Sequence, residues 1–161
     1  MRKETATFGA GCFWGVEVVF SKTAGVVSTI VGYMGGNEKL YPKPTYEHIC
    51  TDKTGYAEVV QIVFDPNKIS YKKLLDIFWG NHDPTTLNRQ GHDFGKQYRS
   101  VIFYHSEKQR KIAQDSKNKI QKRFGTKKKV VTQIVNAETF YPAEEYHQKY
   151  LEKKGLNSCQ I

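Results

Sequence analysis

The sequence predicts an α+β fold: a single two-layer domain in which a mixed or antiparallel sheet packs on helices. The 161 residues are enough to bury one hydrophobic core without disulfides or metals. Strand-like and helix-like segments follow the order β-α-β-β-α-β-α-β-α, whose first part is the split β-α-β-β-α-β pattern of ferredoxin-like folds. Neither a repeat nor a linker interrupts this order. We therefore expect one domain over residues 1–161, with C-terminal additions to the core and a mobile tail from about residue 156.

The first half of the chain contains a helix between strands. Apolar residues lead into Gly9-Ala10-Gly11, and Trp14 and Val18 follow at helical spacing. β-branched residues mark the next strand, and glycine and proline mark the loop after it. The expected elements are a strand over 5–10, a helix over 12–22, a strand over 26–31, a loop over 32–44 and a strand over 56–64.

Capping residues delimit the helices of the second half. Ser70 is the expected N-cap of a helix with one apolar face, and Ser106 with Gln109 forms a capping box for a basic helix. Pro142 suits the first turn of a last helix that Gly155 closes. The expected elements are a helix from 70, an irregular segment over 82–95, a strand over 97–104, the basic helix over 106–125, a strand over 130–135 and a helix over 142–155.

The formal charge of +9 is concentrated in one segment, residues 107–129, which holds ten Lys and Arg residues against two acidic ones. Ile112, Ile120 and Phe124 recur there at helical spacing, which favours a core-facing helix with a solvated basic face. The alternative is a module that binds nucleic acid or an anionic surface. Because the segment lacks the interleaved aromatic residues of single-strand binders, we expect no nucleic-acid partner.

Cysteine usage and the N-terminus predict a cytoplasmic protein. The three cysteines, Cys12, Cys50 and Cys159, are few and widely spaced, unlike the disulfide framework of a small secreted domain. No secretory signal layout precedes the first strand, and no apolar run approaches the roughly 18 residues of a membrane span. We expect thiol chemistry in a reducing compartment, with no membrane partner.

Cys12 lies at the predicted strand-to-helix turn, where helix N–H groups and the helix dipole stabilise a thiolate. The glycines before it allow close approach of a substrate, and Phe13-Trp14 can form an apolar wall beside the sulfur. A turn cysteine is more often a small buried hydrophobic residue. The pattern alone therefore leaves both interpretations open.

Gly11-Cys12-Phe13-Trp14-Gly15 resembles the GCFWG signature of the A-type peptide methionine sulfoxide reductases, the MsrA family. Further segments resemble the same family in the same order, over most of the chain. They are Val31-Gly32-Tyr33, Pro44-Thr45-Tyr46, Thr54-Gly55-Tyr56-Ala57-Glu58, Asn81-His82-Asp83-Pro84-Thr85, Gln97-Tyr98-Arg99-Ser100 and Phe140-Tyr141-Pro142-Ala143-Glu144. The resemblance implies repair of oxidised proteins through reduction of the S epimer of methionine sulfoxide, free or in proteins, by way of a sulfenic acid on Cys12.

The resemblance also implies roles for individual residues. Glu58 matches an acid that an apolar pocket keeps protonated near pH 7. Two tyrosine hydroxyls and an aspartate would bind the sulfoxide, and two aromatic rings would hold its S-methyl group. The expected substrate-binding residues are Phe13, Trp14, Tyr46, Asp93 and Tyr98.

Cys159 matches the family's C-terminal recycling cysteine. A Cys12–Cys159 disulfide would form with loss of water and would be reduced by thioredoxin. Some members of the family have two cysteines near the C-terminus, whereas this chain has Cys159 alone. Tyr56 stands where many members have histidine. Cys50 is inert, oxidisable or an alternative resolving thiol, and we favour the first.

Other functions would use the same residues differently. Cys12 paired with His92 or His147 would make a cysteine hydrolase, although no oxyanion signature accompanies the pair. His82, His92 and Asp93 lack metal-ligand spacing. We expect no metal, no cofactor and a monomer, with thioredoxin as reductant and oxidised proteins, peptides or free methionine sulfoxide as substrates.

Overall fold

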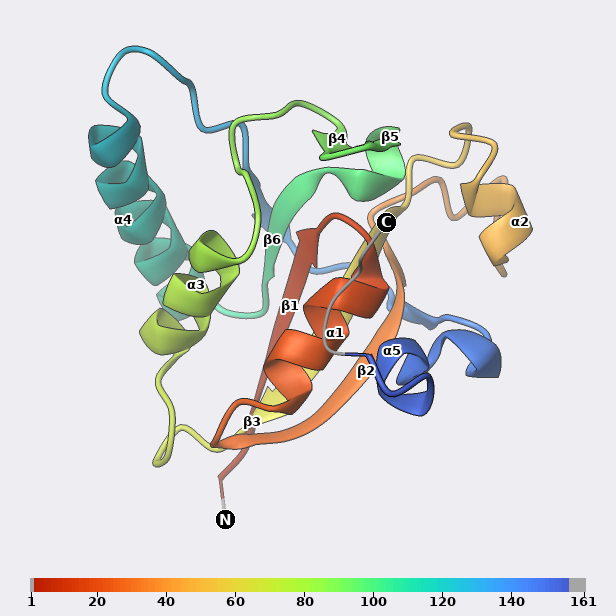
Figure 1. Ribbon diagram of the computed structural model, residues 1–161, viewed down its shortest axis with the longest axis horizontal. Coiled ribbons are helices and arrows are strands. Elements are labelled where there is room, and N and C mark those ends of the chain that lie inside the picture. Colours follow the sequence, from red (N-terminus) through yellow and green to blue (C-terminus); the bar gives the residue numbers. More distant parts are fainter. Residues whose placement is uncertain (1, 157–161) are drawn as a thin grey trace.

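A six-stranded sheet forms the centre of the protein (Figure 1), whose computed structural model describes residues 2–156. The strand order is β7-β6-β1-β3-β2-β8. The strands are β1 (Glu4–Ala10), β2 (Val26–Met34), β3 (Ala57–Phe64), β6 (Ser100–Tyr104), β7 (Gln133–Asn136) and β8 (Tyr141–Pro142). The four strands β6-β1-β3-β2 are antiparallel and make the ferredoxin-like core, while β7 joins β6 in parallel. The predicted α+β fold with a mixed sheet is confirmed.

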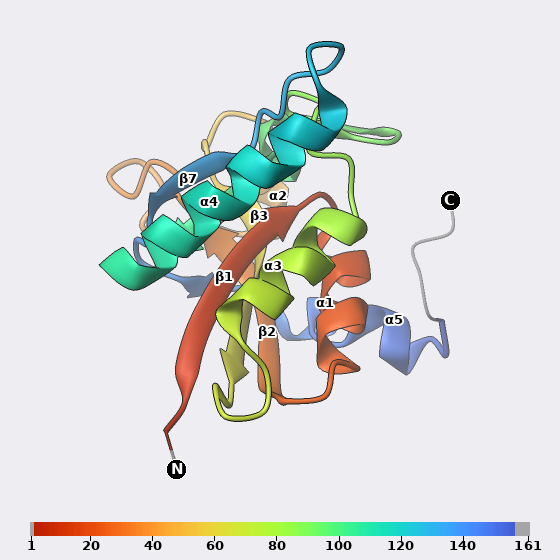
Figure 2. The same ribbon diagram turned by 90° about the vertical axis from the view of Figure 1, so that its left-hand side faces the viewer.

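Three helices cover one face of the sheet (Figure 2): α1 (Phe13–Ser21), α3 (Tyr71–Gly80) and α4 (Glu107–Phe124). Phe8 of β1 stacks there on Phe20 of α1 and Phe78 of α3, with ring centroids 5.6 and 5.1 Å apart. These fully buried rings fix the start of α1 relative to the end of β1, because both elements pack on the same core.

The opposite face carries a second, smaller core. Its buried residues are Met34, Ala57, Val59, Val101 and Phe103. Phe140, just before β8, packs over them. Gly32 permits this approach, because a Cβ there would lie 2.4 Å from the carbonyl oxygen of Tyr141.

The short elements gather at the ends of the sheet. They are α2 (Tyr46–Ile49), β4 (Arg89–Gln90), β5 (Asp93–Phe94), η1 (Lys96–Tyr98), η2 (Glu145–His147) and α5 (Tyr150–Lys153). The predicted strand over 97–104 begins only at Ser100, because residues 96–98 form the turn η1. The predicted capping box of α4 forms in part: Ser106 Oγ accepts from the Gln109 amide, but the Gln109 side chain bonds His105 and Thr5 instead.

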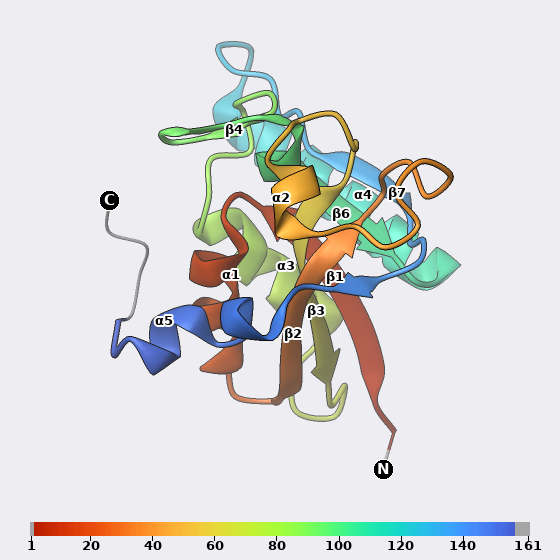
Figure 3. The ribbon, with the colours of Figure 1, turned by 90° about the vertical axis from the view of Figure 1, so that its right-hand side faces the viewer.

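The predicted helix over 142–155 is wrong. Pro142 pairs with Gly32 as part of β8, and only the short η2 and α5 follow. Gln148 explains the difference, since its side chain bonds both the N–H and the carbonyl of Val31 at 3.0 and 2.9 Å. The segment therefore runs beside the edge of β2 (Figure 3) and bonds to its backbone instead of forming a helix. The expected tail and Cys159 lie outside the described residues.

Within residues 2–156, no helix is both long and apolar enough to cross a membrane.

Candidate active site

Cys12 is the N-cap residue of α1, directly after β1. Gly11 makes the turn with φ +95°, and a Cβ on it would lie 2.8 Å from Cγ of Gln90. Only glycine fits this turn without displacing the β4 strand. The Cys12 side chain makes no capping hydrogen bond to the helix, and the residue is partly exposed at the N-terminus of α1.

Glu58 on β3 lies beside the same turn and is 1% exposed. Its Oε1 accepts a hydrogen bond from the backbone N–H of Phe13 at 3.2 Å, and its Oε2 accepts one from Nε2 of Gln97 at 3.0 Å. One carboxyl group therefore joins β3 to the first residue of α1 and to η1. A carboxyl group buried this deeply resists ionisation unless such donors compensate.

Tyr46 and Tyr98 reach the same region from α2 and η1. Burial raises the pKa of both hydroxyls, and the neighbouring Glu58 raises it further. Asp93, Cys12 and Cys50 also raise the pKa of Tyr98. Both phenols consequently stay protonated and can donate hydrogen bonds across the ordinary pH range.

Asp93 is brought to this site by the β4–β5 hairpin, in which it pairs with Gln90. Burial raises the pKa of its carboxyl group, and His92 opposes the rise. Its electrostatic effect on Tyr98 shows that the two groups are neighbours. Asp93, which the family resemblance identified, therefore lies beside a residue five positions later in the chain.

An aromatic wall flanks Cys12. Phe13 is 1% exposed and packs between the rings of Tyr33 and His147, with centroids 5.8 and 5.2 Å away. Trp14 stacks on Tyr150 at 3.8 Å and donates its indole N–H to Nδ1 of His147 at 3.0 Å. Such a surface suits a small apolar group rather than a charged one.

His147 is fully buried within this wall, and its ring also contacts that of Tyr46. Burial lowers its pKa, while Glu144 opposes the change. The bond from the Trp14 indole requires Nδ1 to be an acceptor, so His147 is neutral in this arrangement. The sequence suggested His147 only as a hydrolase base.

Glu144 organises the wall and was missed as a site residue, because it was interpreted as the start of a helix. Its Oε1 accepts from the Tyr33 hydroxyl at 3.0 Å, and its Oε2 accepts from the Tyr46 backbone N–H at 2.9 Å. Burial raises the pKa of Glu144, but these hydrogen bonds outweigh it and leave the pKa below its usual range. Its place in the Phe140–Glu144 motif was the available signal.

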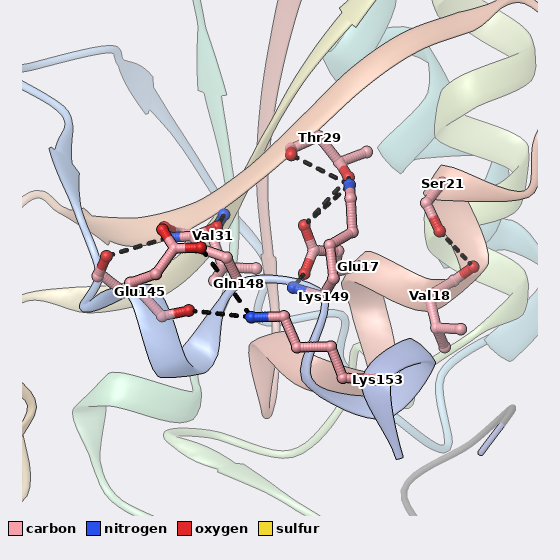
Figure 4. Close-up of polar contacts among 10 residues, drawn as sticks. Glu17, Val18, Ser21, Thr29, Val31, Glu145, Gln148, Lys149 and Lys153 are labelled. Atoms are coloured by element: carbon pink, nitrogen blue, oxygen red, sulfur yellow. Dashed lines mark hydrogen bonds and ion pairs between the residues drawn. The ribbon is translucent and has the colours of Figure 1, made fainter. Parts of the chain in front are cut away.

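The chain after His147 is held against α1 and β2 by buried polar contacts (Figure 4). Glu17 of α1 is 2% exposed and accepts from the Lys149 backbone N–H at 2.6 Å and from the Thr29 hydroxyl at 3.0 Å. Its carboxylate also lies 3.4 Å from Nζ of Lys149. We refer to Glu17, Thr29 and Lys149 as the C-terminal clamp.

Cys50, at the C-cap of α2, lies beside Gln97 and Tyr46 at the edge of the site. Its Sγ is 4.0 Å from Nε2 of Gln97, and it contributes to raising the Tyr46 pKa. The structure thus gathers Cys12, Glu58 and the predicted substrate-binding residues around one point at the end of the sheet, with Cys50 at its edge. His82, by contrast, bonds Phe78 and Ser100 beneath the site.

Comparison with known proteins identifies the family of this site. Residues 4–161 match the family of peptide methionine sulfoxide reductases. Over 160 residues the chain is 58% identical to the peptide methionine sulfoxide reductase MsrA of Methanothermobacter thermautotrophicus, covering 99% of this chain and 93% of that protein.

Solved structures agree. Mxr1 from Saccharomyces cerevisiae in reduced form matches with a TM-score of 0.90 and 39% identity, over 96% of this chain and 87% of Mxr1. Mxr1 in complex with Trx2 matches with a TM-score of 0.64 and 28% identity, over 92% of this chain and 85% of that one. The chain therefore belongs to the peptide methionine sulfoxide reductases and is an oxidoreductase.

Proposed function

We propose that this enzyme reduces the S epimer of methionine sulfoxide, in oxidised proteins, peptides or the free amino acid, with Cys12 as nucleophile and Glu58 as acid. The observation that carries the proposal is the hydrogen bond from Phe13 N–H to Glu58. It places a buried carboxyl group beside the residue that follows Cys12, at the N-terminus of α1.

The chemistry follows from these positions. The Cys12 thiolate attacks the substrate sulfur, and the Glu58 proton passes to the sulfoxide oxygen, with Tyr46 and Tyr98 donating hydrogen bonds to it. The substrate S–O bond and the new bond between Cys12 and the substrate sulfur then break as the hydroxyl moves to the Cys12 sulfur, so methionine leaves with two electrons gained and Cys12 becomes a sulfenic acid. Phe13 and Trp14 hold the S-methyl group, and Asp93 binds in the same pocket.

The enzyme must then be reduced. We propose that the Cys159 thiolate attacks the Cys12 sulfenic acid, releases water and forms a disulfide, which thioredoxin reduces by thiol–disulfide exchange. The complex of the similar Mxr1 with Trx2 supports thioredoxin as the partner. We propose that the enzyme acts as a monomer in the cytoplasm.

The test compares wild type, Cys12→Ser and Cys159→Ser on separate S and R epimers of a methionine sulfoxide peptide, once with thioredoxin and once with dithiothreitol. Wild type should consume the S epimer alone. Cys12→Ser should be inactive, because serine is not ionised at neutral pH. Cys159→Ser should form one methionine per enzyme and then stop when thioredoxin is the only reductant.

Cys50→Ser is the matched control, because it also removes one thiol of the chain. It should recycle normally with thioredoxin. Consumption of the R epimer alone would contradict the proposed specificity, and normal recycling by Cys159→Ser would remove the resolving role of Cys159. Turnover by Cys12→Ser would overturn the mechanism as a whole.

A further inference from the structure

Gln97 is a buried amide to which the chemistry above gives no task. Its side chain is 4% exposed, and its Nε2 lies 3.0 Å from Oε2 of Glu58. Buried amides normally bond to backbone groups or to other structural partners. Here the partner is the group that we propose as the catalytic acid.

The backbone around Gln97 is fixed on both sides. The N–H of Lys96 donates to Oδ1 of Asp52 at 2.8 Å. Nη1 of Arg99 donates to the carbonyl oxygens of Lys96 and Gly55 at 2.9 and 3.0 Å. The turn η1 is therefore tied to the loop before β3, the strand that carries Glu58. Gln97 and Glu58 are held in one rigid unit.

The nitrogen of the Gln97 amide faces both Glu58 and Cys50. Its NH₂ group has two hydrogens, of which one points to Glu58 and the other can reach Sγ of Cys50 at 4.0 Å. A flipped amide would direct its oxygen at the carboxylate that remains after Glu58 has given up its proton, which has no hydrogen to donate. Cys50 thus has a structural task beside the site: its sulfur accepts the second hydrogen of the amide.

We propose that Gln97 is a positioning residue for Glu58, which holds the carboxyl group through Oε2 and stabilises the carboxylate that remains after Glu58 has given its proton to the substrate. This inference rests on the proposed role of Glu58 as the acid. It adds the residue that lets so deeply buried an acid become charged during the reaction.

The physical argument is a balance between burial and hydrogen bonding. Burial disfavours the carboxylate, whereas the two donors, Phe13 N–H and Gln97 Nε2–H, favour it. The other titratable groups around Glu58 are Tyr33, Tyr46 and Tyr98, together with Cys12, Cys50 and Asp93 near the tyrosines. The three phenols are neutral at ordinary pH, and Phe13 N–H and Gln97 Nε2–H are neutral donors that favour the carboxylate.

The test measures the rate of the first turnover, without reductant, from acid to alkaline pH. Gln97→Met keeps the length of the side chain but removes the donor. Its rate should fall about tenfold, and the alkaline limit of the pH profile should move up by about one pH unit, because Glu58 becomes a weaker acid. Gln97→Asn keeps an amide that is too short to reach, and it should shift the limit in the same direction.

Gln109→Met is the matched control, because Gln109 is also buried, at 6% exposed, but bonds His105 and Thr5 in the α4 region. It should lower stability and leave the pH profile unchanged. An unmoved alkaline limit in both folded Gln97 variants, with Glu58→Gln inactive, would overturn the inference while the proposed function stands. If Glu58→Gln keeps the wild-type rate, the acid assignment falls and the inference falls with it.

Discussion

Among single residues, the site places a buried carboxyl group beside two tyrosine hydroxyls. Glu58 is buried among phenols, and the raised pKa values of Tyr46 and Tyr98 keep those phenols as donors. Donors that are fixed before the substrate arrives cost no reorganisation when charge develops on the sulfoxide oxygen. The tyrosines should therefore affect the rate more than the binding of substrate.

Tyr98→Phe tests this distinction. It removes one hydroxyl and keeps the ring, so the first-turnover rate should fall by roughly 10- to 100-fold with little change in the substrate concentration for half-maximal rate. Stopped-flow mixing with a methionine sulfoxide peptide measures both quantities. Tyr104→Phe, on the neighbouring strand β6, is the control and should react as wild type does. An equal loss in both variants would contradict a specific role for the Tyr98 hydroxyl.

At the scale of elements, the C-terminal clamp joins a segment that has little regular structure to α1 and β2. Glu17 accepts hydrogen bonds from two residues far apart in sequence, Thr29 and Lys149, while lying almost fully buried. By contrast, Glu145 and Lys153 form an exposed pair 4.0 Å apart in the same segment. Buried carboxylates depend on their partners, and exposed pairs contribute little.

Glu17→Gln should therefore lower the free energy of unfolding by about 2 kcal/mol and speed hydrogen exchange at the amides of α5. Urea denaturation and exchange followed by mass spectrometry measure the two effects. Glu145→Gln alters the exposed pair of the same segment and should change neither by more than about 0.5 kcal/mol. Equal effects in the two variants would show that the buried carboxylate does not hold the segment.

The elements that the sequence predicted well are those with their own periodicity or caps. α3 begins after Ser70 and α4 ends at Gly125 as expected, and β1, α1 and β3 have nearly the predicted bounds. The C-terminal segment has no such pattern. Hydrogen bonds of the Gln148 and Glu144 side chains to distant parts of the chain decide its path instead. α2 has only four residues, too few for a periodic signal.

The same reasoning separates the site residues. Cys12, Glu58, Tyr46 and Tyr98 lie in motifs of the family, and Asp93 was identified by the same resemblance. The structure brings these residues together, and their roles are proposals. Gln97 opens the Gln97–Ser100 motif, but nothing in the sequence shows that its amide faces Glu58, since that contact spans 39 positions. Long-range polar contacts of this kind become visible only when the sheet is assembled.

At the scale of the whole molecule, a partly buried histidine joins the helical layer to the sheet. His82 lies after α3, its Nδ1 is 2.7 Å from the carbonyl oxygen of Phe78, and its Nε2 is 2.7 Å from Oγ of Ser100. Ser100 in turn lies 2.7 Å from the Thr132 hydroxyl. Burial lowers the pKa of His82 to about 4, from an ordinary value of 6.5.

This shift predicts how stability depends on pH. Because the unfolded chain takes up a proton at His82 below pH 6.5 and the folded chain only near 4, stability is full above 6.5 and falls between these values. The loss should reach about 3 kcal/mol at most. His105 and His147, whose pKa values are also lowered, add to it in the same direction.

Urea denaturation of wild type and His82→Asn at a series of pH values isolates the contribution of His82. The variant should be less stable near neutral pH and should show a shallower decline between pH 6.5 and 4, because asparagine does not titrate. Parallel curves for the two proteins would show that protonation of His82 does not weaken the fold.

Because Trp14 stacks on Tyr150, it is an intrinsic fluorescence probe of the C-terminal segment. The chain has two tryptophans, and the indole of the other, Trp79, donates to Ser116 between α3 and α4, on the other helices of the same layer. Trp14 touches Tyr150 and His147, both in the segment that the C-terminal clamp holds. Its fluorescence therefore reports whether that segment is seated, without any added label. In a Trp79→Phe background, the emission would come from Trp14 alone and would show whether the C-terminal segment stays seated while the enzyme turns over.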